Sequence, residues 1–175
     1  MDCRSLCVTV GLAVVLAACE PVAGSPAATA SAAPCPVTLA FQLPPDEAID
    51  FMRAGSSAQP THEEAVAAAR RTNWAGNDGI WVVLPNDGVV TWGSTTFGSK
   101  FGLYAFGTGR MTATARRFGG VTPPGFEASI GTSEQGYGPP GFIASGLTFP
   151  SNGCWEVTYR IAERSVTFVV DVQRK

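Results

Sequence analysis

The residues of this chain that could do covalent or acid–base chemistry are its thiols, its single imidazole and a few neighbouring carboxylates. The cysteines number five: Cys3, Cys7, Cys19, Cys35 and Cys154. A thiol can be acylated, can form a disulfide or can hold a metal, and the segment around it decides between these fates. The segment that carries each cysteine is therefore the first question.

Cys19 ends an apolar run that begins at Leu6. A helix needs roughly 20 apolar residues to cross a bilayer, so this shorter run is typical of the hydrophobic region of an export signal. The run closes as Leu-Ala-Ala-Cys (16–19), which resembles the bacterial lipobox. The resemblance implies a diacylglyceryl group on the thiol of Cys19 and cleavage just before it, so that residues 1–18 form a lipoprotein signal peptide. The alternative is an ordinary signal peptide in which Cys19 has no role.

Residues 19–34 are predicted to be a disordered tether. After the cysteine they read EPVAGSPAATASAAP, with no aromatic residue, no apolar period and almost no charge. Such a segment cannot bury enough surface to offset the entropy lost on ordering. Its prolines disfavour the alternative, an alanine-rich helix. Because two acyl chains hold a protein on a bilayer, we expect the membrane to be a partner and the location to be extracytoplasmic and lipid-anchored.

Cys35 and Cys154 remain once the signal peptide is removed and Cys19 is lipidated. An exported protein meets an oxidising compartment, where a leftover pair of cysteines usually forms a disulfide. We therefore predict a Cys35–Cys154 bridge, which would pin the incoming chain to the penultimate strand. Two free, buried thiols are the alternative. Two cysteines without a neighbouring histidine make a poor zinc site.

Other polar residues with chemical potential have simpler structural interpretations. His62 lies where a helix is predicted to start, and an exposed position there is favoured over a general base. Asp46 and Asp50 could share one face of a helical turn, without resembling an acid–base pair. The tripeptide Asn-Asp-Gly at 77–79 and at 86–88 could offer oxygens to calcium, but tight turns explain both copies.

No catalytic motif emerges from the rest of the chain. We find no metalloprotease, redox, phosphate-binding, dinucleotide or serine-hydrolase signature, so no catalytic residue, metal site or cofactor is predicted. The net charge is −2, with no basic cluster, and nucleic acid is therefore not an expected partner.

The elements that must position these residues are predicted to be mostly strands, in one domain over residues 35–175. A helix is expected at about 61–71, where Thr61 and Glu64 have capping-box spacing, and 44–52 has the composition of a short helical turn. Strands are expected at 80–85, 89–92, 100–106, 111–118, 126–131, 142–149, 154–161 and 165–172. Short strands at regular spacing predict an all-β, antiparallel sandwich.

Turn chemistry predicts hairpins within this series. The Asn-Asp-Gly at 86–88 suggests a hairpin of its flanking strands, and Gly-Thr-Gly-Arg at 107–110 suggests another. The last hairpin, 154–172, is the clearest because Trp155, Val157 and Tyr159 alternate with polar residues. The heptapeptide PPGFEAS (123–129) returns as PPGFIAS (139–145), which indicates two similar entries from a turn into a strand.

Residues 136–172 resemble the C-terminal half of a family of uncharacterised bacterial lipoproteins and secreted proteins. The shared pattern is Gly-Tyr-Gly, then Gly-Phe-x-Ala-Ser-Gly-Leu, Phe-Pro and Gly-Cys-Trp-Glu-Val-Thr; CPVT (35–38) and GNDGIWVVLPNDGVV (76–90) resemble earlier segments. The resemblance implies an Ig-like β-sandwich outside the membrane and brings no established activity. The chain departs from the family at 99–110, where SKFGLYAFGTGR replaces a tryptophan-rich stretch. A binding role of those tryptophans therefore does not carry over.

These expectations favour a non-enzymatic, lipid-anchored module that binds a partner or supports the cell envelope. An envelope protein or a glycan is the expected class of partner. The alternative is a cell-envelope hydrolase or carbohydrate-processing domain whose acidic residues meet only in space. A deep cleft lined by two carboxylates would favour the enzyme, whereas a shallow surface with exposed aromatic residues on its loops would favour binding.

Overall fold

Two β-sheets and two short helices make up the described part of the chain. The structure is a computed structural model, and it describes residues 34–54, 57–77, 79–92, 99–132 and 141–174. The elements are α1 (Asp46–Ala54), α2 (His62–Ala69), β1 (Asn73–Gly76), β2 (Ile80–Leu84), β3 (Val89–Trp92), β4 (Ser99–Ala105), β5 (Met111–Arg117), β6 (Glu127–Ile130), β7 (Gly141–Thr148), β8 (Gly153–Ile161) and β9 (Arg164–Arg174). The predicted β-rich class is confirmed.

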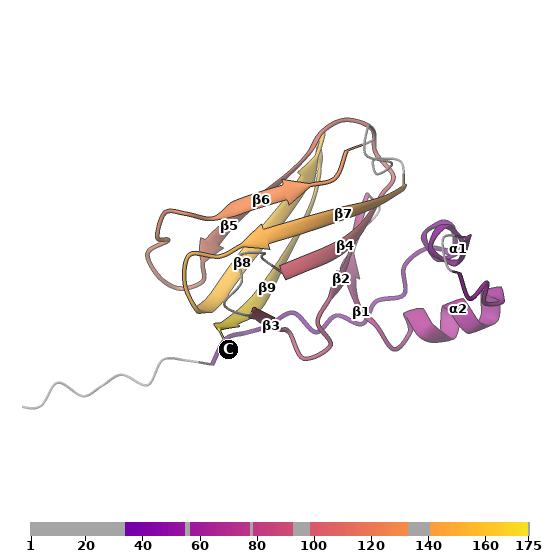
Figure 1. Cartoon of the computed structure of the whole chain (residues 1–175), viewed down its shortest axis with the longest axis horizontal. Coiled ribbons are helices and arrows are strands. Elements are labelled where there is room, and N and C mark those ends of the chain that lie inside the picture. The colour runs from indigo at the N-terminus through magenta and orange to yellow at the C-terminus, as the bar shows by residue number, and fades with distance from the viewer. Residues whose placement is uncertain (1–33, 55–56, 78, 93–98, 133–140, 175) are drawn as a thin grey trace, which may run out of the picture. The chain divides into compact units, whose positions relative to one another are not determined.

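The strands form two layers that pack face to face as a sandwich (Figure 1). One sheet has five strands in the order β1-β2-β4-β7-β6, and the other has four in the order β3-β9-β8-β5. Most neighbours are antiparallel, but β3 pairs with β9 in parallel, with Val89 opposite Asp171. The sandwich is therefore mixed and not purely antiparallel as predicted.

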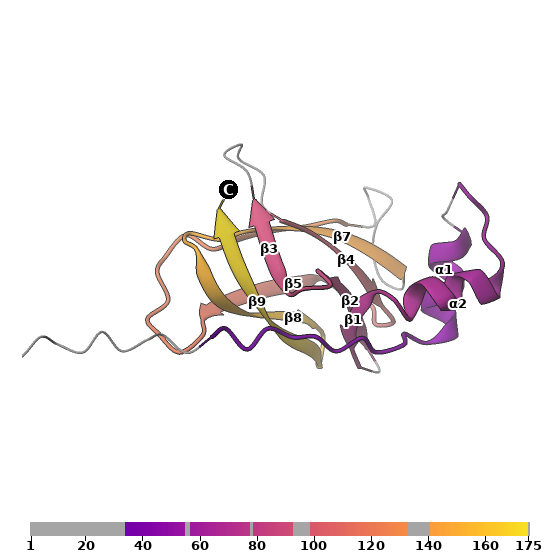
Figure 2. The same ribbon diagram turned by 90° about the horizontal axis from the view of Figure 1, so that it is seen from below.

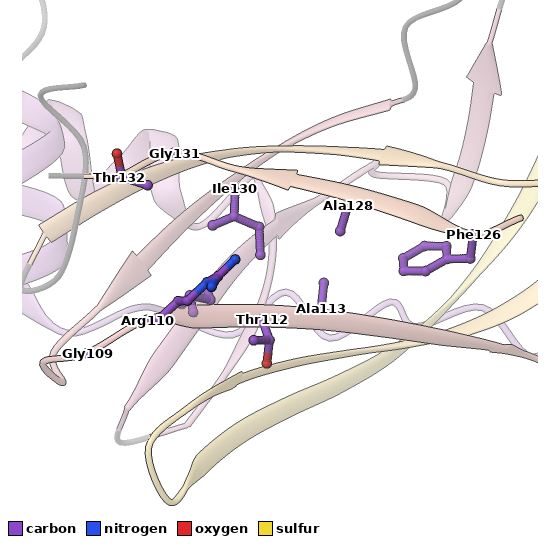
Figure 3. A pocket seen from close by; sticks show the side chains of 10 residues that line it. Gly109, Arg110, Thr112, Ala113, Phe126, Ala128, Ile130, Gly131 and Thr132 are labelled. Carbon is purple, nitrogen blue, oxygen red and sulfur yellow. The ribbon is translucent and has the colours of Figure 1, made fainter. Parts of the chain in front are cut away.

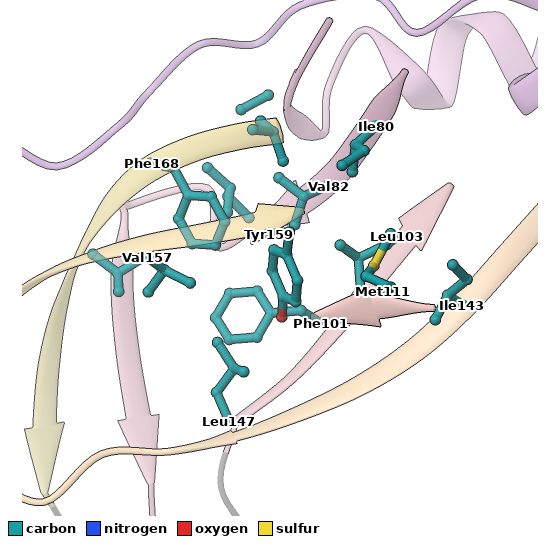
Figure 4. Close-up of a cluster of buried hydrophobic side chains, with 14 of the residues drawn as sticks. Ile80, Val82, Phe101, Leu103, Met111, Ile143, Leu147, Val157, Tyr159 and Phe168 are labelled. Atoms are coloured by element: carbon teal, nitrogen blue, oxygen red, sulfur yellow. The ribbon is translucent and has the colours of Figure 1, made fainter. Parts of the chain in front are cut away.

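The core lies between the two sheets and is built by strict alternation along the strands. In β8, Trp155, Val157, Tyr159 and Ile161 are fully buried, as their spacing predicts. They meet apolar side chains of β2, β4 and β7, among them Leu103 (Figure 4). A fully buried aliphatic or aromatic side chain contributes about 1.5–3 kcal/mol through the hydrophobic effect, so this interior is the main source of stability.

The turns were located correctly, but two of the expected hairpins were wrong. The turn at 86–88 leads from β2 to β3, which lie in different sheets, and the turn at 107–110 leads from β4 to β5, also in different sheets. Only the final hairpin forms as predicted, with Tyr159 opposite Val166. A turn signal shows that the chain reverses, but the sheet that receives the next strand depends on distant pairing.

Two helices stand where one helix and a short turn were expected. α2 begins with the predicted capping box, in which the backbone N–H of Thr61 donates to Glu64 and the backbone N–H of Glu64 donates to the Thr61 hydroxyl. It ends at Ala69, two residues before the predicted end at 71. α1 is a full helix of nine residues. Both helices pack on Trp74 of β1, a strand that the sequence analysis missed.

An extended N-terminal segment, residues 34–43, closes one flank of the sandwich. The N–H of Thr38 donates to Val169 of β9, and the N–H of Gln42 donates to Trp74 of β1. Figure 2 shows the segment running past β9 and β1 before it enters α1. It therefore pairs with the edge strand β1 and with the part of β9 that β3 leaves unpaired.

The buried side chain of Asn73 holds this segment in place. Its Nδ2 donates to the carbonyls of Thr38 and Pro85, each at 2.9 Å. Its Oδ1 accepts from the N–H groups of Ala40 and Phe41 at 3.0 and 3.2 Å. All of the hydrogen-bonding capacity of this amide is thus used on backbone groups.

Candidate functional site

The opposite flank of the sandwich is bounded by the edge strands β5 and β6, and a groove of about 570 Å³ lies between them. We call it the β5–β6 groove; its lining residues are Gly109, Arg110, Met111, Thr112, Ala113, Phe126, Ala128, Ile130, Gly131 and Thr132. Its volume falls within the range of small-ligand pockets, roughly 300–1000 Å³. Because it also lies between two edge strands, we take it as the candidate site.

Small side chains keep the groove open. Ala113 of β5 and Ala128 of β6 project toward the space between the strands, with Phe126 at one end and Ile130 toward the other (Figure 3). Phe126 is anchored against the core through the ring of Phe149, at 5.6 Å between centroids. Two alanines at mid-groove leave a gap that larger residues would fill.

A single cationic side chain, Arg110, lies at the Ile130 end of the groove (Figure 3). It is exposed, and Thr112 and Thr132 also border the groove, with their hydroxyls turned away from the space between the strands (Figure 3). None of the described residues that line the groove carries a carboxylate. The site therefore presents an apolar floor and one positive charge.

The backbone of β5 also faces this flank with unpaired groups. The N–H of Phe118 donates to the carbonyl of Cys154, which sets the hydrogen-bonding phase of the β5–β8 ladder. In an antiparallel pair such bonds alternate, so Met111, Ala113 and Ala115 direct their N–H and C=O groups away from β8.

The edge of β6 has the same character. The N–H of Gly131 donates to Ala144 of β7, so Ala128 and Ile130 direct their backbone groups away from β7. The groove is therefore bordered on both sides by backbone donors and acceptors. On the opposite flank, residues 34–43 take up the corresponding role.

The predicted disulfide is confirmed. Cys35 and Cys154 are bonded, with 5.4 Å between their Cα atoms, and the bridge joins the N-terminal segment to β8, the penultimate strand. It lies apart from the groove lining. The predicted lipidation site, Cys19, the signal peptide 1–18 and the tether up to residue 33 lie outside the described residues.

His62 is the first residue of α2 and is exposed, as predicted. Its Nδ1 lies 3.0 Å from a carboxylate oxygen of Asp50, and its Nε2 lies 3.9 Å from Asp46. The hydrogen bond from His62 lowers the pKa of Asp50 below its ordinary value of 3.8. These contacts join α1 to α2, so we assign the cluster a structural role. It lies outside the β5–β6 groove.

The Asn-Asp-Gly at 86–88 is a turn, as predicted, whereas Asp78 of the copy at 77–79 lies outside the described residues. Asn86 accepts a hydrogen bond from the N–H of Asn73, and Asp87 accepts one from the N–H of Val89. Gly88 has a φ of +70°, which suits glycine in such a turn. In the first copy, Asn77 accepts from the N–H groups of Gly79 and Ile80.

The sequence analysis did not identify the groove residues. Arg110 follows a turn and Ala113 and Ala128 are ordinary strand residues, so nothing in the sequence marks them as neighbours. The only signal is the alternation at 111–115, which puts Met111, Ala113 and Ala115 on one face of the strand; Met111 is buried there and the two alanines are half-buried. In the described ranges, no three histidine, cysteine or acidic side chains are placed to hold a metal ion.

No family model, curated protein sequence or solved structure matches this chain. Within the described part of the chain, neither helix has the length and apolar character needed to cross a bilayer.

Proposed function

We propose that this protein is a lipid-anchored extracytoplasmic binding module whose recognition surface is the β5–β6 groove. The observation that carries the proposal is an open flank with an apolar lining and one arginine, opposite a flank that residues 34–43 close. The described lining of the groove holds no carboxylate, which supports binding over the alternative of an acid–base hydrolase.

The proposed anchor rests on the sequence around Cys19 and on the disulfide. Leu-Ala-Ala-Cys at 16–19 has the lipobox pattern, and Cys35–Cys154 is a bond typical of an oxidising compartment. These features agree with export followed by attachment through Cys19.

Strand order supports an Ig-like assignment of the sandwich. In Ig domains one sheet runs A-B-E-D and the other contains C, F and G. Here β2-β4-β7-β6 would correspond to A-B-E-D and β9-β8-β5 to G-F-C. We propose on this basis that the domain is Ig-like, with α1, α2 and β1 as additions, and that it belongs with the family of uncharacterised lipoproteins that it resembles.

The anchor is tested by replacing Cys19. Cys19→Ala is expected to abolish incorporation of a radiolabelled fatty acid and to release the protein from the membrane fraction, because the acylated thiol is lost. Cys35→Ala is the matched control and is expected to keep the label. Label that persists in Cys19→Ala would contradict the anchor.

The recognition surface is tested by photo-crosslinking in cells. A photoreactive amino acid at Ala128, which lines the groove, is expected to capture a discrete partner. The same probe at Ser129, exposed on the opposite face of β6, is the control. Equal crosslinking at the two positions would overturn the assignment of binding to the groove.

A further inference from the structure

We propose that the β5–β6 groove binds an extended peptide as an added strand on the edge of β5, with an acidic group of the peptide at Arg110. The inference rests on the proposed binding function and names the chemical class of the ligand. It depends on the backbone of β5, the lining of the groove and the charge of this flank.

The backbone of β5 offers a row of donors and acceptors at the spacing of a strand. Met111, Ala113 and Ala115 direct N–H and C=O groups outward, and the described residues supply them no partner. The row ends at Arg117, whose N–H donates to the Thr122 hydroxyl at 2.8 Å. A peptide that adds a strand uses such a row for affinity.

Within the described ranges, the first five residues of β5 show none of the devices by which proteins usually block strand addition. Proline, lysine, bulges or a covering segment commonly protect an edge. β5 reads MTATARR, so its first five residues contain neither proline nor charge. The opposite flank, in contrast, is covered by residues 34–43 through Thr38 and Gln42. No described segment covers β5 in this way.

The groove lining has the period and the size that an added strand requires. Phe126, Ala128 and Ile130 alternate along β6 and line the groove together with Met111 and Ala113 of β5. From 126 to 132 an extended chain spans roughly 20 Å, enough for about six residues of a bound peptide. Alternate apolar side chains of that peptide would occupy the space beside Ala113 and Ala128.

Arg110 sets the charge of the ligand. Two arginines of the domain have a carboxylate partner: Arg116 pairs with Glu156 at 2.6 Å, and Arg53 pairs with Asp50 at 3.2 Å. Among the described residues Arg110 has no such partner, and its side chain lies over the groove (Figure 3). An acidic side chain or a terminal carboxylate near the start of β5 would complete a charge-assisted hydrogen bond.

The Ig-like assignment gives the same edge a precedent. Variable-type domains extend the G-F-C sheet beyond strand C with two further strands. In the proposed assignment β5 is strand C, so a peptide on β5 would occupy the position of the next strand. A lipid acyl chain could also fill an apolar groove, but it would leave the backbone row without partners.

The test selects a phage-displayed library of random peptides on the full chain held in phosphatidylcholine nanodiscs. We expect selected peptides to carry apolar residues at alternate positions and an acidic residue toward one end. Binding of a selected peptide should slow amide hydrogen exchange at Met111, Ala113 and Ala115. N-methylation of alternate peptide amides should abolish binding, whereas methylation of the intervening amides should not.

Two pairs of variants locate the peptide. Ala113→Pro removes an outward N–H without removing a ladder bond and is expected to weaken binding by roughly tenfold or more, at unchanged thermal stability. If Ala113→Pro does not fold, Ala128→Trp is the test variant, because its indole would fill the groove and block the peptide. Ser129→Trp, on the opposite face of β6, is its control. Arg110→Gln should lower the affinity for acidic peptides by roughly tenfold and leave the affinity for their amidated, neutral analogues unchanged. Arg160→Gln is the control.

The outcomes separate this inference from the proposed function. Selected peptides that bind Ala128→Trp and wild type equally, or that tolerate methylation at every amide, would overturn strand addition. If lauric acid binds the groove and Ala128→Trp blocks it while no peptide is selected, the peptide inference fails and binding at the groove stands. The proposed function fails as well if Ala128→Trp changes the binding of neither peptides nor lauric acid, and crosslinking at Ala128 equals that at Ser129.

Discussion

Asn73 joins three segments that are distant in sequence. Its amide bonds to the carbonyls of Thr38 and Pro85 and to the N–H groups of Ala40 and Phe41, while its own N–H donates to Asn86. The residue is fully buried. Buried backbone groups that lose their partners cost far more than the net gain from a typical hydrogen bond.

Replacing Asn73 with alanine should therefore be strongly destabilising. We expect Asn73→Ala to lower the free energy of unfolding by about 2–4 kcal/mol, because four backbone groups lose their partner. Urea unfolding gives this value, and hydrogen exchange at Ala40 and Phe41 should accelerate. Gln173→Ala, on an exposed side chain that bonds only to Asp171, is the control, expected within about 0.5 kcal/mol of wild type.

The carboxylate of Asp50 reports on the contact between α1 and α2. Its pKa is lowered from 3.8 chiefly by the hydrogen bond from His62, with Arg53 adding to the effect against some desolvation. A depressed pKa in the folded state means that the contribution to stability is complete above the unfolded pKa. It is lost as the pH falls through the lower, folded pKa.

Removing the imidazole should raise this pKa. We expect His62→Ala to shift the pKa of Asp50 upward toward 3.8, measured by NMR titration of the side-chain carboxyl carbon. Glu63→Ala, one position along α2, should leave the Asp50 titration where it is in the wild type. An Asp50 pKa unchanged in His62→Ala would show that the contact does not form in solution.

At the scale of elements, the disulfide fastens the N-terminal segment to β8. Cys35 and Cys154 are 119 residues apart, so the bridge constrains most of the domain in the unfolded state. The same segment reaches β9 through Thr38, whose hydroxyl accepts from the N–H of Val169. Bridge and hydrogen bonds together hold the closed flank.

Reduction should weaken the whole domain and loosen this segment first. We expect a loss of about 2–5 kcal/mol in the free energy of unfolding, the usual effect of removing a native disulfide. Urea unfolding with and without a thiol reductant measures it, and peptide mapping without reduction should recover the two cysteine peptides as one species. Equal midpoints in both conditions would show that the bridge does not constrain the unfolded chain.

At the scale of the whole molecule, a buried hydroxyl pair connects the two sheets. Ser145 of β7 and Tyr159 of β8 share a hydrogen bond across the core, and both are almost completely buried. Burial raises the pKa of Tyr159 above its ordinary value of 10.0, so the phenol stays protonated at neutral pH. The bond thus fixes how the sheets face each other at one point of an otherwise apolar interior.

A double-mutant cycle should reveal this connection. Ser145→Ala and Tyr159→Phe are each expected to cost about 1–3 kcal/mol because each leaves a buried hydroxyl without its partner. The double variant should cost less than the sum, with a coupling energy of about 1 kcal/mol. The hydroxyl pair Thr158–Thr167, on the solvent side of β8 and β9, is the control, expected to show a coupling below about 0.5 kcal/mol. Equal coupling in the two pairs would contradict the role of burial.

Local pattern sufficed where an element depends on its own residues. The alternation of Trp155, Val157 and Tyr159 identified β8 and its buried face, and the capping box identified the start of α2. The disulfide could be predicted because elimination left only two cysteines for the folded domain. β1 escaped notice because its four residues show no alternation and depend on β2 and the helices for burial.

The sequence by itself thus determined the β-rich class, most strands and their inward faces, because side-chain period and turn chemistry act over a few residues. Only the tertiary structure decided which sheet each strand joins, that β3 runs parallel to β9, and that one flank is closed while β5 and β6 border a groove. These features arise from backbone pairing and packing between residues far apart in the chain, and no local pattern encodes which distant edge is left unpaired.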